Sequence, residues 1–194
     1  GRRMPGSNST RPSGVAATHP MVAQVTLKGD AYASTLHTTQ FIDKVLAELG
    51  HYPGVERVAA VNGLPLDRGL NTGGSPADHP DAKHIVEFRT VTPGYFRTLG
   101  ISILSGRDVT MDDTANSVPV ALISETAARH WWPGQSAIGK EVLVGGKTSW
   151  RVVGVVADTH SHSLAESPRL VVYAPFVQLS DEMTRVIDGW FPTT

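Results

Sequence analysis

Short stretches of the chain alternate apolar and polar residues or run apolar, which is typical of strands. These stretches are Val22–Leu27, Val55–Val61, Ile85–Val91, Val118–Ile123, Val142–Val144, Trp150–Val156 and Leu170–Tyr173. Gly145-Gly146 lies between two of them and predicts a hairpin turn. Residues Leu66–Lys83 hold almost no large apolar side chain, so we expect a long loop there.

A helical period replaces this alternation over about Ala33–Leu49. Ile42, Val45, Leu46 and Leu49 follow the spacing i, i+3, i+4 and i+7, which places them on one helical stripe. Gly50 then predicts the end of the helix. A helix between two predicted strands indicates a small α/β layer with the helix against one sheet face.

Capping residues predict two shorter helices. Thr92 can cap the first, with Pro93 at its first position and Gly100 just past its end. Ser124 is a suitable N-cap for the second, and Glu125 favours the positive end of that helix. The pattern as a whole predicts an α+β fold with two small α/β subdomains.

The second short helix carries two adjacent tryptophans, Trp131 and Trp132. On a regular helix adjacent residues point about 100° apart, so we expect one in the core and the other at a seam between subdomains. The alternative is a contact with a substrate or an adaptor, because exposed aromatic surface is typical of interaction sites.

Composition excludes several classes of function. The 194 residues include 17 basic and 18 acidic side chains with no basic stripe, so a nucleic-acid partner is not expected. Cys is absent, which excludes disulfides, thiol catalysis and Cys-based zinc sites. No apolar run is long enough to cross a bilayer, and Gly1–Pro20 lacks the apolar region of a signal peptide. Residues 1–21 are polar and are predicted to be a disordered lead-in.

The best enzyme-like cluster is Asp158, His160 and His162, which follow a predicted strand and could supply three ligands to Zn²⁺. No HExxH sequence accompanies them, and a solvated loop explains them more simply. Asp112-Asp113, with Asp108 nearby, could bind Ca²⁺ or serve as paired carboxylates. No EF-hand spacing follows them, which favours a polar turn.

Other motifs also have simpler structural explanations. Gly145–Thr148 (GGKT) lacks the earlier glycine of a phosphate loop and joins two predicted strands rather than a strand and a helix. Asn71–Ser75 is expected to be a flexible loop rather than a ligand cradle. Ser124 lacks the G-x-S-x-G elbow of hydrolases, so helix capping explains it better. No catalytic, cofactor-binding or metal-binding residue is predicted, and no cofactor.

A set of motifs in fixed order resembles the periplasmic core domain of MacB-type permeases, in the ABC-transporter family that includes FtsX-like proteins. The matching motifs are Val91–Phe96, Leu99–Ile101, Ser105–Arg107, Ile123–Glu125, Ala128–Arg129, Trp132–Gly134, Ile138–Lys140, Arg151–Val156 and Tyr173–Pro175. Each motif is loose by itself, and together they cover roughly Val22–Gln178. The resemblance implies a domain inserted between the first two transmembrane helices of a permease.

The resemblance also implies a division of the chain. Residues 22–105 would be the first half of a porter-like subdomain, 106–178 an inserted α/β subdomain, and 179–194 the start of a truncated second porter half. The missing half would leave an unpaired sheet edge at the strands predicted before residue 92. The domain would lie on the extracytoplasmic, periplasmic side of the bacterial inner membrane, as a soluble fragment.

In such a permease the domain would have no active site and would pass ATP-driven movement to substrate or adaptor. Its implied partners are the permease's own transmembrane part, a cytoplasmic ATPase domain or subunit, a second permease protomer and a periplasmic adaptor. Arg107 follows Gly106 at the expected crossing between subdomains, where a guanidinium can bind several backbone carbonyls. Arg107, Trp131, Trp132, Tyr95 and Phe96 are the structural or interface candidates.

Two alternatives remain at this point. One is a metal-dependent extracytoplasmic hydrolase that uses Asp158, His160 and His162. The other is a static binding module without any coupling to transport.

Overall fold

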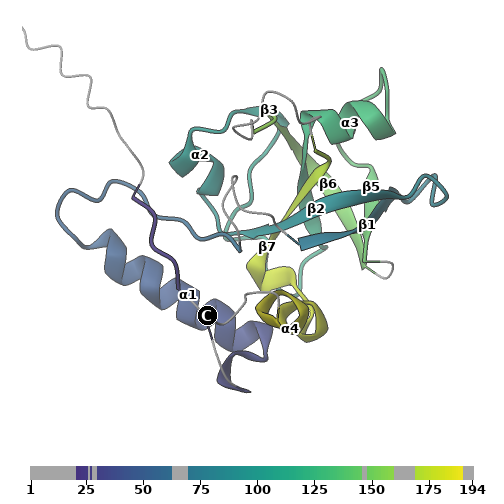
Figure 1. The fold of residues 1–194 in the computed structure, drawn as a ribbon. Coiled ribbons are helices and arrows are strands. Elements are labelled where there is room, and N and C mark those ends of the chain that lie inside the picture. The colour runs from purple at the N-terminus through teal and green to yellow at the C-terminus, as the bar shows by residue number, and fades with distance from the viewer. Residues whose placement is uncertain are drawn as a thin grey trace, which may run out of the picture.

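Most of the chain folds around one mixed β-sheet with helices at its surface (Figure 1). The computed structural model describes residues 21–25, 27, 30–62, 70–145, 148–159 and 169–189. The strands are β1 (Leu70–Pro76), β2 (His84–Val91), β3 (Ile103–Gly106), β4 (Val120–Ser124), β5 (Glu141–Val144), β6 (Thr148–Val156) and β7 (Val171–Pro175). The helices are η1 (Asp30–Tyr32), α1 (Thr35–Gly50), α2 (Tyr95–Leu99), α3 (Glu125–Trp131), η2 (Phe176–Gln178) and α4 (Asp181–Gly189).

The sheet closes on itself. Its order is β3-β6-β4-β7-β2-β1-β5, and an additional pairing joins β5 back to β6, so that six strands form a ring and β3 pairs with β6 beside it. Strand β6 makes this possible because one of its edges serves two partners. Residues Thr148–Arg151 pair with β5, whereas Gly154–Val156 pair with β3. The ring is therefore a small barrel, which leaves no open edge between its six strands.

Alternate residues of the ring face its interior. Val172 of β7 and Ile123 of β4 belong to the interior core, together with the fully buried Trp150 of β6. Their neighbours in sequence, Tyr173 and Leu122, belong to a second buried cluster on the outside of the ring. This separation follows from the period-two geometry of strands, and burial of both faces explains why β4 and β7 are apolar runs in the sequence.

Helix α2 covers this outer cluster. The ring centroids of Tyr95 and Phe96 lie 5.2 Å apart, and Phe96 lies 5.0 Å from Tyr173, both in edge-to-face arrangements. Such aromatic contacts add to the stabilisation from buried apolar area. The outer face of β4 and β7 is therefore a second core rather than an exposed surface.

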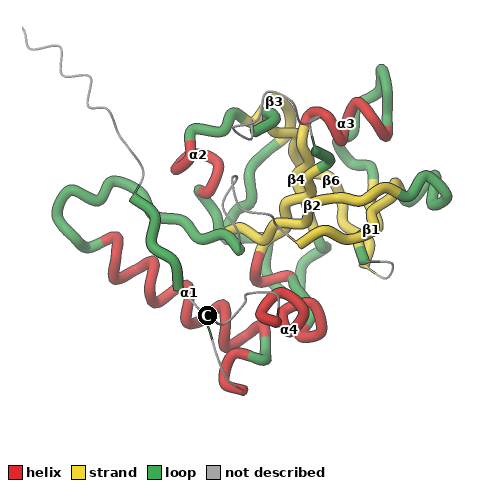
Figure 2. Tube along the Cα trace, in the orientation of Figure 1, coloured by secondary structure: helices red, strands yellow, loops and turns green. Residues whose placement is uncertain are grey.

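Helices α1 and α4 lie together at another side of the barrel, where η2 connects β7 to α4 (Figures 1 and 2). Ser34 caps α1 by accepting a hydrogen bond from the backbone N–H of His37. The predicted stripe residues Ile42, Val45 and Leu46 are half-buried, and Leu49 is exposed. The predicted helix is confirmed, with bounds shifted by one or two residues.

Several other predictions from sequence are confirmed. The structure is α+β, and β2, β4, β5, β6 and β7 fall where the apolar runs predicted strands. Ser124 caps α3, since its hydroxyl accepts from the backbone N–H of Ala127. Gly100 ends α2 with a positive φ of 69°.

Two predicted strands are wrong. Of Val22–Leu27, the described residues 22–25 and 27 lie outside any strand, and Val22 and Val25 are exposed. Val55–Val61 is irregular except for a single bridge from Val61 to Val91. Strand β2 already pairs with β1 on one edge and β7 on the other, so Val61 reaches it only beyond the end of β1. The expected unpaired sheet edge at β2 is likewise wrong.

The long loop predicted over Leu66–Lys83 is wrong at Leu70–Pro76, which forms β1, whereas residues 77–83 are a loop as predicted. The Gly-rich segment pairs with β2 and with β5 through its backbone. At Gly74 an ideal Cβ would lie 2.7 Å from a methyl carbon of Val86, so the absent side chain permits close packing. Composition missed this strand because main-chain pairing in a closed ring needs no large apolar side chains.

The predicted cap of α2 needs a correction as well. The helix begins at Tyr95, after Gly94 with a positive φ of 84°, so Pro93 precedes the helix. The Thr92 hydroxyl instead accepts a hydrogen bond of 2.8 Å from the backbone N–H of Ala60. Thr92 thereby holds the segment before β1 against the end of β2.

The expected division of the chain meets a continuous sheet. Strand β2 lies within 22–105 and β7 within 106–178, yet they pair directly. A boundary between residues 105 and 106 would therefore pass through one ring of strands. The assignment of the porter halves stays a prediction, and residues 1–20 and 190–194 lie outside the described part of the chain.

Glycine is required where β6 meets the turn after β3. A Cβ on Gly154 would lie 2.4 Å from the carbonyl oxygen of Arg107, which is backbone and cannot move aside. We expect Gly154→Ala to destabilise the fold by about 1–3 kcal/mol, the usual cost of overpacking. The measurement is urea unfolding. The matched control is Gly73→Ala on β1, where a Cβ meets nothing within 4 Å; equal stability of the two variants would contradict the close-contact argument.

Candidate functional site

Segments from the two ends of the described chain meet at the start of α1. The backbone N–H of Thr35 donates to the Asp181 carboxylate at 2.8 Å, although 146 positions separate the two residues. The Thr35 and Thr184 hydroxyl oxygens lie 2.6 Å apart, and both side chains are buried. Asp181 therefore acts as an additional cap on α1, supplied by α4. We call Thr35, Asp181 and Thr184 the junction.

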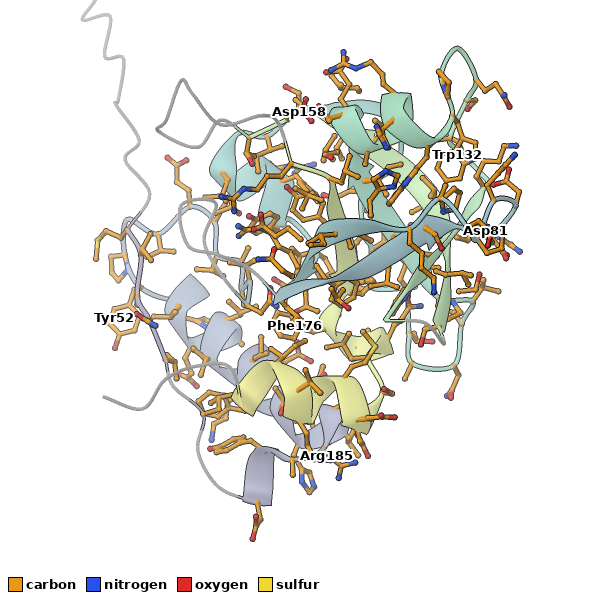
Figure 3. The ribbon with its side chains drawn as sticks, turned by 45° about the vertical axis from the view of Figure 1, so that its right-hand side comes forward. Tyr52, Asp81, Trp132, Asp158, Phe176 and Arg185 are labelled. Carbon is orange, nitrogen blue, oxygen red and sulfur yellow. The ribbon has the colours of Figure 1, made fainter. Side chains whose placement is uncertain are left out.

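The surroundings of the junction favour the charged form of the Asp181 carboxylate. The hydrogen bond from the Thr35 backbone N–H lowers the pKa of Asp181 below its ordinary value, and Arg185 and His37 add to the effect. The positive end of a helix favours such a carboxylate. Arg185 lies on the face of α4 that points away from the barrel (Figure 3).

Short connections fix the junction to the barrel. Gln178 of η2 accepts from the backbone N–H of Val120 at 2.9 Å, at the start of β4. Its amide nitrogen donates to the carbonyl oxygens of Thr114 and Val118 and to the Ser117 hydroxyl. Leu179 belongs to the interior core, and Figure 3 shows Phe176 between the barrel and α4. Helix α4 is held to the barrel by this connection and by its own Ile187 and Met183, which pack on the interior core.

Arg107 lies at the turn after β3 and has a carboxylate partner. Its guanidinium donates two parallel hydrogen bonds to Asp113, at 2.8 and 2.9 Å, and one to the Asp108 carbonyl oxygen. Sequence reasoning expected several backbone carbonyls, whereas the structure shows one carbonyl and a bidentate carboxylate. Planar pairing of this kind requires arginine rather than lysine.

Asp113 completes this corner. It is nearly buried, and burial acts to raise its pKa, but the hydrogen bonds from Arg107 and from the Thr110 backbone N–H outweigh burial and leave the pKa lowered. Asp108 has a raised pKa because of its burial. The corner is a structural ion pair, and its contacts are internal to the loop between β3 and β4.

The expectation that only one tryptophan of the pair would reach the core is wrong. Trp131 and Trp132 both belong to the interior cluster, with ring centroids 5.9 Å apart. Trp132 lies beyond the regular helix, with φ of −133° and ψ of 66°, so helical spacing does not set its direction. Its indole nitrogen donates to Asp78 between β1 and β2 (Figure 3). Neither ring offers an exposed interface.

Tyr95 and Phe96 are likewise buried, so they hold α2 to the barrel rather than face a partner. Burial raises the pKa of the Tyr95 hydroxyl, and Arg89 and Glu87 lie close enough to modulate it. Arg89 and Glu87 themselves form a buried ion pair on the outer face of β2. Of the five candidates from sequence, four are core residues and one forms the ion pair with Asp113.

The residues of the hydrolase alternative are only partly described. Both carboxylate oxygens of Asp158 accept from Thr126, one from its backbone N–H at 3.0 Å and one from its hydroxyl at 2.6 Å. Asp158 therefore caps the start of α3 (Figure 3). His160 and His162 lie outside the described residues. Within the described ranges, no group of three or more His, Asp or Glu side chains could hold a metal ion.

The two glycine-rich motifs, Gly145–Thr148 and Asn71–Ser75, are in or beside strands of the sheet. Gly145 follows β5 and has a positive φ of 65°. The antiparallel pairing of β5 with β6 confirms the predicted hairpin. Gly146 and Lys147 lie outside the described residues. Asn71–Ser75 is part of β1, so the flexible loop expected there is wrong. No helix in the described ranges is long and apolar enough to cross a membrane.

Comparison with known proteins identifies the class. Residues 6–191 match the family described as the MacB-like periplasmic core domain. Because this match spans most of the sequence, the chain belongs to that family, a domain of ABC-transporter permeases.

One related protein supports this family membership. The macrolide export ATP-binding/permease protein MacB of Mannheimia succiniciproducens is 30% identical over 90 residues, which is 46% of this chain and 14% of that protein. The chain therefore spans a small part of that relative's length.

Two solved structures share the fold. The periplasmic region of MacB from Actinobacillus actinomycetemcomitans aligns with a TM-score of 0.54 and 19% identity over 70% of this chain and 55% of that one. The extracellular domain of the noncanonic ABC-type transporter YknZ from Gram-positive bacteria aligns with a TM-score of 0.53 and 20% identity, covering 81% and 68%. At these identities the likeness establishes the architecture alone.

Sequence reasoning missed the junction. Ser180 and Asp181 are a recognisable helix start, and the Ser180 hydroxyl does accept from the Met183 backbone N–H. That signal finds α4 but cannot say that Asp181 also caps a helix 146 positions earlier. Thr35 and Thr184 carry no local signal, because a pair of buried hydroxyls is defined only by the packing of the two helices.

The lowered pKa of Asp181 gives a pH prediction. Because the folded pKa lies below the unfolded value of about 3.9, the carboxylate stabilises the fold above that pH. This contribution is lost as the pH falls through the folded pKa. Asp181→Asn should therefore unfold at lower urea than the parent at pH 7, and the difference should shrink toward pH 3.

The control is Asp43→Asn, in the exposed middle of α1. It should track the parent at each pH more closely than Asp181→Asn does. A difference for Asp181→Asn that stays constant across the acid range would contradict the assigned hydrogen bond.

Proposed function

We propose that this domain is a non-catalytic transmission module of a MacB-like ABC permease. Movement of the membrane part would enter through the segments that carry α1 and α4. The junction would make these two segments move as one body and pass their movement to the barrel. The observation that carries the proposal is the set of contacts from Thr35 to Asp181 and Thr184.

The barrel would move as a rigid body. Its six strands pair in a closed ring, and its interior is filled by large side chains such as Phe88 and Trp150. Close-packed interiors transmit displacement rather than absorb it. The junction and η2 make fewer contacts with the barrel than the strands of the barrel make with one another. A change in the angle between the barrel and the helices would therefore cost the least free energy at the junction and η2.

The same contacts support a revised division of the chain. Residues 30–61 and 179–189 would form the membrane-proximal part around α1 and α4. Residues 70–178 would form the barrel, including η2 as its connection. This arrangement keeps the idea of a split outer part and an inserted part, with the first boundary moved from residue 105 to the segment before β1.

The partners follow from the proposed place in a permease. They are its own transmembrane part, a cytoplasmic ATPase domain or subunit, a second protomer and, on the extracytoplasmic side, an adaptor. The formal charge of −1 with balanced acids and bases supports no nucleic-acid partner.

The hydrolase alternative has less support. Both oxygens of Asp158 already serve a structural role, since they accept hydrogen bonds from Thr126 at the start of α3 and one lies 3.7 Å from Arg129. A static binding module fits the same fold, and it differs from transmission in what the junction should do during transport.

The test is made in the full-length permease with the junction broken. Asp181→Ala/Thr184→Val removes the acceptor for the Thr35 N–H and the partner of its hydroxyl. We expect ATP hydrolysis to continue while transport falls, because the two membrane-proximal segments no longer move together. The surface pair Glu125→Ala/Arg129→Ala removes an exposed ion pair of α3 and is the matched control.

A covalent repair separates lost transmission from misfolding. Cysteines at positions 35 and 184 would replace hydroxyls whose oxygens lie 2.6 Å apart, in a domain with no other Cys. In the Asp181→Ala background, oxidation to the disulfide should restore transport and reduction should abolish it again. Transport that is indifferent to the state of these cysteines would favour a static module.

A further inference from the structure

Two histidines from distant elements converge at the surface of the barrel. His84 begins β2, and His130 lies in the last turn of α3, 46 positions later. Their Nε2 atoms are 2.9 Å apart. The rings meet edge to face, with centroids 4.3 Å apart and an interplanar angle of 85°.

The His84 ring is oriented by the backbone. Its Nδ1 lies 3.0 Å from the Ala82 carbonyl oxygen, which can only accept, so Nδ1 carries the proton. The Nε2 atom of His84 therefore presents its lone pair toward His130. A backbone carbonyl commonly accepts from the other ring nitrogen of a histidine that binds a metal, and this hydrogen bond fixes the tautomer and the orientation of the ring.

We propose that His84 and His130 form a binding site for a divalent transition-metal ion, with Cu(II) bound most tightly. Neutral imidazole nitrogens are good ligands for Cu, Ni and Zn ions. The two nitrogens are 2.9 Å apart, close enough for one ion to reach both at metal–nitrogen distances of about 2.0–2.1 Å. Sites with nitrogen ligands generally bind Cu(II) more tightly than the other divalent first-row ions, so Cu(II) is expected to bind most tightly here.

The proton balance of this site is simple. Without an ion, the Nε2–H of His130 donates to Nε2 of His84. When an ion binds, His130 shifts its proton to Nδ1, and the two rings turn so that both Nε2 lone pairs point at the ion instead of along the line between the two nitrogens. His130 is exposed, so water can exchange that proton and fill the remaining coordination positions. The described residues supply no third ligand, which makes this an exchangeable surface site rather than a closed structural one.

The site would join the start of β2 to α3. These elements contact the interior core from different sides, and Trp131 and Trp132 follow His130 directly. An ion held by both rings would bind the folded state in preference to the unfolded chain, and so stabilise the domain by mass action.

Calorimetric titration of residues 1–194 with CuCl₂, in a buffer with glycine as competing ligand, tests the proposal. We expect one saturable site with a two-nitrogen signature in the electron paramagnetic resonance spectrum. His84→Ala/His130→Ala should weaken this site by more than the roughly 10–100-fold lost when a group that only hydrogen-bonds to a metal ligand is removed. Near-ultraviolet circular dichroism of the adjacent tryptophans checks that the variant folds. The single variant His130→Asn, at an exposed position, repeats the test if the double variant does not fold.

Two matched controls remove other imidazole pairs. His160→Ala/His162→Ala removes the histidines of the hydrolase alternative, and His37→Ala/His51→Ala removes two from the α1 region. Both should retain the parent's Cu(II) affinity. Unchanged binding in the His84 and His130 variants, or loss of binding with His160 and His162, would overturn the proposal.

Discussion

The structure depends on the way strand β6 shares its edges. This strand pairs with β4 along one edge and with both β5 and β3 along the other. The pairing with β5 closes the ring, and the pairing with β3 brings the outer cluster under α2 into place. This arrangement is tight at Gly154, because the backbone of Arg107 occupies the space that a side chain would need. The bidentate pair of Arg107 with Asp113 then fixes the loop that leaves β3.

A closed ring explains which parts of the sequence were predictable. Strands such as β6 and β7 could be located because burial on one face leaves a period of two and burial on both faces leaves a short apolar run. Strand β1 could not, since its Gly-rich segment is held by main-chain hydrogen bonds on both edges. Val22–Leu27 and Val55–Val61 carry the right pattern but find no free edge in the ring. Alternation indicates that a segment can be a strand, whereas pairing depends on which edges the rest of the fold leaves open.

The candidate site was less predictable than the fold. Arg107 stood out because it follows a glycine at a sharp turn, and its importance did not depend on knowing Asp113. The tryptophans misled because Trp132 leaves the helix, so helical spacing no longer applies. The sequence does not predict the junction, because Thr35, Asp181 and Thr184 come together only when segments at opposite ends of the described chain pack against each other.

These observations describe a rigid barrel carried on two helices that are joined at one point. If the helices form their own cooperative unit, their amides should exchange together, and separately from those of the ring. Native-state hydrogen exchange at rising urea concentration measures this directly. The account predicts that α1 and α4 open together at a lower free energy than β4, β6 and β7, which exchange by global unfolding. Opening of α1 and α4 at different free energies, or of the whole domain in a single step, would contradict it.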